Sequence, residues 1–187
     1  MKKVLLVLAG VVLLSVQGYA AGLCIANPDC LISNQGNFAI GGESTIWSQT
    51  FTLSAATEVL ARTWSYSGGT NLDGDVIPAG GFDPILSIYL LSTGVQVAQN
   101  DDWNTGAGLW DSYMRPYLAA GSYAIVMTVF NNFPAGNFYP TATGTPSFAG
   151  RTREWAVDVS TIPEPVTMAL FGSGSLALGL VRRFRRS

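Results

Sequence analysis

Between residues 34 and 160, the apolar residues of this chain fall in short runs that are separated by Gly, Pro, Asn and Asp. No segment there carries an apolar stripe at helical spacing over three turns, so the pattern predicts strands rather than helices. The expected strands cover residues 38–40, 45–53, 58–66, 84–91, 95–99, 121–130 and 154–159. Seven short strands joined by turns are typical of a β-sandwich. We therefore expect one all-β, jelly-roll-like sandwich domain over residues 37–160.

The N-terminus has the parts of a secretory signal in the usual order. Two lysines precede an apolar run at 4–16, and small residues follow up to Ala20. This order predicts a signal peptide over residues 1–20 that signal peptidase removes, and then an N-terminal loop over residues 21–36. A permanent transmembrane helix is an alternative, although the run is shorter than the ~20 residues of a membrane span. A lipoprotein signal ahead of Cys24 is another, disfavoured because a leucine precedes that cysteine.

The C-terminal segment, residues 162–187, reads as a membrane stop. A proline-containing stretch precedes an apolar helix expected over residues 166–181, and the chain then ends in Arg182, Arg183, Arg185 and Arg186. About sixteen apolar residues are just enough to insert as a helix, and terminal arginines hold the cytoplasmic side. We therefore expect the helix to enter the inner membrane.

Pro163, Glu164 and Pro165, followed by a Gly-rich apolar helix and an arginine cluster, resemble the PEP-CTERM sorting signal of Gram-negative bacteria. This resemblance implies recognition by a membrane-embedded exosortase and removal of the hydrophobic tail. It further implies delivery to the cell surface or an extracellular polysaccharide matrix. The alternative is an ordinary C-terminal anchor that is never cleaved.

The only two cysteines lie close together near the start of the exported chain. An Asn-Pro-Asp sequence between Cys24 and Cys30 favours a turn that brings the sulfurs together. Nearby cysteines usually pair in an oxidising compartment, so we expect a Cys24–Cys30 disulfide. A redox-active or metal-binding pair is the weaker alternative, because the spacing is not Cys-x-x-Cys.

Three central segments resemble the bacterial pre-peptidase C-terminal domain, a secreted β-sandwich. They are an Asp that opens a strand, an Asn-Asp-Asp turn and a Gly-x-Tyr entry to a late strand, at residues 82–89, 99–102 and 118–126. Segments 68–70, 130–133 and 155–159 further resemble a PEP-CTERM-associated branch of such sandwiches, whose members carry no established activity. The long aromatic insertion at 103–117 departs from the usual domain and leaves strand pairing there open.

Charge and residue usage exclude several classes of function. If both ends are processing signals, residues 22–161 keep four arginines, no lysine and eleven acidic groups, a net charge of −7. An acidic domain is a poor partner for nucleic acid. The chain has no histidine, which removes Ser-His and Cys-His nucleophile pairs and most zinc sites. We accordingly expect no catalytic residues and no enzymatic activity.

Aspartates in or beside turns are the candidate ligands for structural calcium: Asp73, Asp75, Asp83, Asp101 and Asp102, with Asp111 nearby in sequence. Calcium takes six to eight oxygen ligands, and extracellular modules bind it weakly. An EF-hand is excluded because Val76 occupies the position that requires glycine. The alternative is that these aspartates cap turns and keep a lysine-free domain soluble.

Trp103, Asn104 and Trp110 are the candidates for a glycan contact, since aromatic faces stack on sugar rings and Asn binds hydroxyls. The alternative is that the aromatic residues cover one end of the core. The sequence as a whole therefore predicts an exported, exosortase-sorted, non-catalytic surface or matrix protein. A carbohydrate-binding module that contacts extracellular polysaccharide is the second prediction.

Overall fold

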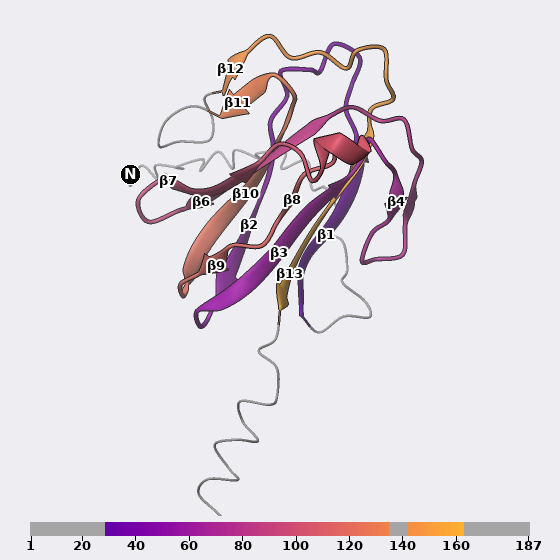
Figure 1. Cartoon of the computed structure of the whole chain (residues 1–187). Coiled ribbons are helices and arrows are strands. Elements are labelled where there is room, and N and C mark those ends of the chain that lie inside the picture. The colour runs from indigo at the N-terminus through magenta and orange to yellow at the C-terminus, as the bar shows by residue number, and fades with distance from the viewer. Residues whose placement is uncertain (1–28, 135–141, 163–187) are drawn as a thin grey trace, which may run out of the picture.

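The computed structural model of the chain describes residues 29–134 and 142–162. Two sheets make up most of this part (Figure 1). The first sheet contains, in spatial order, β1 (Cys30–Asn37), β13 (Glu154–Ile162), β3 (Thr57–Trp64) and β8 (Tyr113–Met114), with β9 (Tyr117–Leu118) also paired to β3. The second contains β2 (Trp47–Leu53), β10 (Gly121–Val129), β6 (Pro84–Leu90) and β7 (Val95–Asn100). The all-β class is therefore confirmed.

Short elements complete the described chain. Two hairpins pair β4 (Gly69–Thr70) with β5 (Val76–Ile77), and β11 (Asn132–Pro134) with β12 (Ala142–Gly144). One 3-10 turn, η1 (Thr105–Ala107), lies in the aromatic insertion. Within residues 29–134 and 142–162, no helix has the length and hydrophobicity of a membrane span.

The two main sheets share one hydrophobic core. Alternate residues of β3 and β13, including Val59 and Val157, are buried in the same cluster as Ile88 and Ile125 from the second sheet. Trp155 links the sheets directly, because its ring centroid lies 5.1 Å from that of Trp47. Burial on facing sides of two sheets is compatible with the predicted sandwich.

Six of the seven expected strands are present with shifts of a few residues at their ends. Residues 38–40 were expected to be a strand, but they form a loop between β1 and β2. Phe38 is still buried there, whereas Ile40 is 86% exposed. The apolar pattern at 38–40 therefore reflects one core side chain rather than a strand.

The expected N-terminal loop, residues 21–36, is wrong over its last part, because Cys30–Asn37 forms β1 and pairs antiparallel with β13. Two polar residues in its middle hide the strand pattern. Ser33 is fully buried and donates a hydrogen bond to Asp158 at 2.8 Å, and Asn34 donates to Gln49 at 3.1 Å. These hydrogen bonds, to β13 and β2, satisfy the polar side chains in a buried position.

Candidate functional site

Two adjacent strands bring three of the candidate aspartates to one place. The strands β6 and β7 form an antiparallel hairpin in which Leu86 lies opposite Asn100. Asp83 stands immediately before β6, and Asp101 and Asp102 stand immediately after β7. The start of the first strand and the end of the second meet at the same edge of an antiparallel pair. The three carboxylates therefore lie at one end of this hairpin.

Residues 112–113, at the start of β8, form hydrogen bonds with this end of the hairpin. The hydroxyl oxygen of Ser112 lies 2.7 Å from the carbonyl oxygen of Pro84 and 2.8 Å from that of Asn100, and it accepts a hydrogen bond from the Leu86 amide at 3.1 Å. The Asn100 side chain accepts from the Tyr113 amide at 2.8 Å and donates to the Asp102 carbonyl at 3.1 Å. The backbone on both sides of the aspartates is thus held in place.

Ligand oxygens of Asp83, Asp101 and Asp102 all lie within 4.8 Å of one another. One oxygen of each carboxylate, Oδ1 in all three, is buried and has no hydrogen-bond partner among the described residues. A buried acceptor without a partner is costly, and three in one place are unusual. We call these three residues the aspartate cluster.

Burial, and to a smaller extent repulsion between the carboxylates, raises the pKa values of the aspartate cluster. Burial raises the pKa of Asp83 to about 8, with the charges of Asp101 and Asp102 adding to the shift. Burial and the charge of Asp102 raise the pKa of Asp101 to about 6, and burial raises that of Asp102. A bound cation would remove this repulsion, and an all-oxygen donor set of carboxylates fits a hard ion such as Ca²⁺.

Asp73 and Asp75 lie elsewhere, in the loop of the β4–β5 hairpin. Asp75 accepts from the Asn71 side chain at 3.0 Å and its amide donates to Asn71 Oδ1 at 2.7 Å, which closes the loop. The Asp73 amide donates to Ser33 Oγ at 3.1 Å. The structure therefore divides the five calcium candidates into the aspartate cluster and a separate pair.

Two other aspartates accept hydrogen bonds within the fold. Asp111 is buried and accepts hydrogen bonds from the amides of Ser65 and Ser67, both at 2.7 Å. Asp158, which the sequence pattern did not single out, is buried in β13 and accepts from Trp64 Nε1 at 2.6 Å, besides Ser33. Asp158 lies on the face of β13 opposite the core residues Val157 and Val159, so the alternation of the strand marks it as an outward position and gives no sequence signal of its burial.

The three candidate glycan-contact residues differ in their contacts. Trp103 is 50% exposed and stacks on Tyr113, with ring centroids 5.3 Å apart. The Asn104 side chain is used locally, because it accepts from the Ala107 amide and caps η1. Trp110 packs against Tyr66 and lines a cavity that Trp103 does not line.

The predicted terminal features lie outside the described residues. These are the signal peptide at 1–20, the sorting residues Pro163, Glu164 and Pro165, the apolar helix at 166–181 and the membrane-stop arginines Arg182, Arg183, Arg185 and Arg186. Cys30 is disulfide-bonded. Cys24, the only other cysteine of the sequence, is also outside the described residues.

Comparison with models of known protein families finds none that matches this chain, and comparison with curated proteins also finds no match.

Proposed function

We propose that this chain is an exported, exosortase-sorted, non-catalytic component of the cell surface or extracellular matrix, built on a β-sandwich that calcium stabilises. One observation carries the calcium assignment: Asp83, Asp101 and Asp102 converge, each with a buried and unpartnered oxygen. Up to six carboxylate oxygens come from these residues, and water or a ligand would complete the shell of six to eight.

We further propose that the sandwich is jelly-roll-like. The chain alternates between the two main sheets, from β1 to β2, to β3, to the β6–β7 hairpin, to β8 and β9, to β10 and finally to β13. Such crossing between sheets is how a jelly roll arranges eight strands in two layers.

Export is supported by the order of features at both ends of the sequence. A signal peptide would direct the chain out of the cytoplasm, and exosortase would process it at the membrane. The disulfide at Cys30 suits an oxidising compartment outside the cytoplasm. The absence of histidine from the whole sequence supports a role without catalysis.

Thermal unfolding of the purified full-length chain tests the calcium site. We expect millimolar calcium to raise the Tm above the value in chelator, because a ligand that binds only the folded state stabilises it by mass action. Calcium at a hundred times its Kd adds about 2.7 kcal/mol, which corresponds to roughly 5–10 °C for a chain of this length.

Paired aspartate variants provide the control. Asp101→Asn should lose the calcium-dependent shift, whereas Asp75→Asn, in the separate loop, should keep it. The assignment would be wrong if the wild-type Tm did not respond to calcium, or if Asp101→Asn responded as strongly as the wild type.

A further inference from the structure

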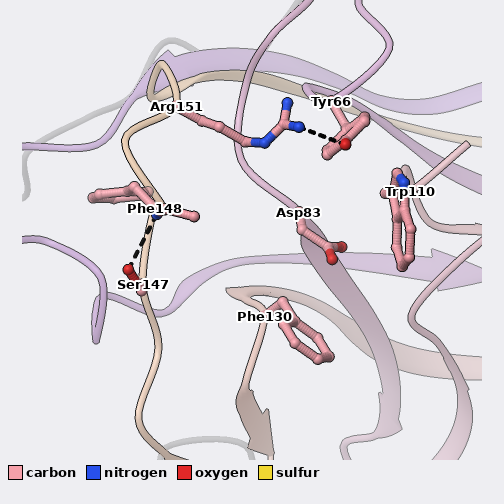
Figure 2. A pocket seen from close by; sticks show the side chains of 8 residues that line it. Tyr66, Asp83, Trp110, Phe130, Ser147, Phe148 and Arg151 are labelled. Carbon is pink, nitrogen blue, oxygen red and sulfur yellow. Dashed lines mark hydrogen bonds between the residues drawn. The ribbon is translucent and has the colours of Figure 1, made fainter. Parts of the chain in front are cut away.

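A cavity of about 210 Å³ opens beside the aspartate cluster (Figure 2). Asp83 belongs to both, because its carboxylate is part of the cluster and its side chain also lines the cavity. The rest of the lining comes from loops at the same end of the molecule, and its side chains are Tyr66, Trp110, Phe130, Ser147, Phe148, Ala149 and Arg151.

Aromatic side chains form much of the cavity wall. Trp110 and Phe130 lie on either side of the Asp83 carboxylate (Figure 2). Trp110 is held by Tyr66, with ring centroids 6.1 Å apart, and Phe130 is held by Phe133 in an edge-on contact. Phe130 remains 42% exposed. Fixed, partly exposed aromatic faces provide platforms for a flat apolar surface, such as the carbon–hydrogen face of a sugar ring.

Arg151 supplies the positive charge of the cavity. Its guanidinium lies over the Tyr66 ring, 3.7 Å from the centroid, and donates to the Tyr66 hydroxyl. A further N–H points to the Gly81 carbonyl at 3.5 Å. A guanidinium has five N–H donors, so donors remain for a ligand. Because the group is planar and held by stacking, it suits a carboxylate bound through two hydrogen bonds.

The charge of the cavity depends on the cation. Without it, Arg151 is the one positive charge that acts on Asp83, and the negative charge of the aspartate cluster would repel an anionic ligand. With Ca²⁺ bound, the cluster keeps a single net negative charge beside the arginine, and the ion still needs oxygen ligands beyond the carboxylates. Ligand hydroxyls could fill those positions from the cavity side.

We infer that the cavity is a calcium-dependent subsite for one acidic sugar residue of a polysaccharide, its ring against Trp110 and Phe130 and its carboxylate on Arg151. The inference rests on the proposed calcium site. The volume is below the ~300–1,000 Å³ of sites for drug-sized ligands, which limits the occupant to a single ring.

Calorimetric titration of the full-length chain with galacturonate, glucuronate, galactose and glucose tests this inference at fixed free calcium. We expect at least one uronate to bind, and its neutral counterpart, which differs only at the carboxylate, to bind at least tenfold more weakly. Chelation of calcium should abolish uronate binding. Binding of neither uronate would overturn the inference, as would equal binding of the neutral sugar or binding in chelator.

Variants assign the contacts. Arg151→Lys should reduce the preference for the uronate because the ammonium keeps the charge but cannot bind the carboxylate through two parallel hydrogen bonds, and Trp110→Ala should abolish binding. Trp110→Phe should retain part of the affinity because it keeps an aromatic ring in the fold. Trp103→Ala is the matched control and should bind as the wild type does, and loss of binding in it would place the subsite elsewhere.

A calcium titration of the same sample separates the two proposals. If calcium binds and no uronate does, the subsite is wrong while the calcium site stands. If calcium itself does not bind, the calcium site is wrong, and the calcium-dependent subsite fails with it.

Discussion

Asp83 belongs both to the aspartate cluster and to the lining of the cavity. Burial raises the pKa of Asp83 most. The charges of Asp101, Asp102 and Asp111 raise it further, and the charge of Arg151 lowers it. In the calcium-free chain the folded state therefore binds a proton more tightly than the unfolded state, in which the pKa is near 3.8. The direction of this shift determines how stability depends on pH.

Calcium-free stability should fall as the pH rises. A group whose pKa is raised by folding to about 8 stabilises the fold below the unfolded value of 3.8, and that contribution is lost as the pH rises through about 8. Asp101, with its pKa raised to about 6, acts in the same direction. We expect the Tm in chelator to decrease from pH 5 to pH 8.

Asp83→Asn removes the titration of Asp83 and leaves that of the other groups, so comparison with the wild type measures the contribution of Asp83 to the pH dependence of the Tm. The variant should show a smaller decrease over the same pH interval, and calcium should raise the wild-type Tm more at pH 8 than at pH 5. A wild-type Tm that rises between pH 5 and pH 8 in chelator would contradict the expectation.

At the scale of elements, β1 contributes to the core as well as to the edge of its sheet. Gly36 lies opposite Trp155 in the register of β1 and β13. A Cβ at Gly36 would lie 2.6 Å from Trp155 Cζ2, closer than carbon atoms approach in proteins. The indole of Trp155 therefore fills the space that any side chain at this position would need.

Gly36→Ala should destabilise the chain by about 1–3 kcal/mol, the usual cost of overpacking a core. Urea unfolding followed by tryptophan fluorescence measures this loss, because the buried Trp47 and Trp155 become exposed on unfolding. Gly106→Ala is the control, since its Cβ would meet only Asn104 Oδ1 at 3.4 Å and should change stability by less than about 0.5 kcal/mol. Equal stability of the two variants would show that β1 does not press on the core.

For the whole molecule, the distribution of charge matters more than its sum. The full sequence has a net charge of −2, whereas residues 22–161 alone carry −7. The basic groups at the two ends belong to the segments that we expect to be processed. Removal of both terminal segments would leave an acidic domain without lysine. A net negative charge favours binding of a cation and helps to keep a domain in solution.

Mass spectrometry of the protein from its native host tests this processing. We expect a mature chain that begins at Ala21 and lacks the apolar residues 166–181 and the arginines that follow. An N-terminus at Ala21 with an intact C-terminus would favour an uncleaved anchor over exosortase processing. A chain that keeps residues 1–20 would contradict the signal peptide.

The residue pattern predicted the all-β class and most of the long strands, and the expected strands at 84–91 and 95–99 already imply how Asp83, Asp101 and Asp102 come together. Asp83 precedes a strand, a short turn follows that strand, and Asp101 and Asp102 end the next one. Two strands joined by a short turn usually pair with each other in an antiparallel hairpin. The start of the first strand and the end of the second then lie side by side.

Three-dimensional packing is needed to explain the rest. It placed Asp73 and Asp75 in a separate loop, made β1 a strand through buried polar contacts, and set Trp110 and Arg151 beside Asp83. These contacts join residues far apart in the chain, and they depend on how the two sheets pack rather than on local propensity or periodicity. The residue pattern of one segment does not indicate which other segment it packs against across the core.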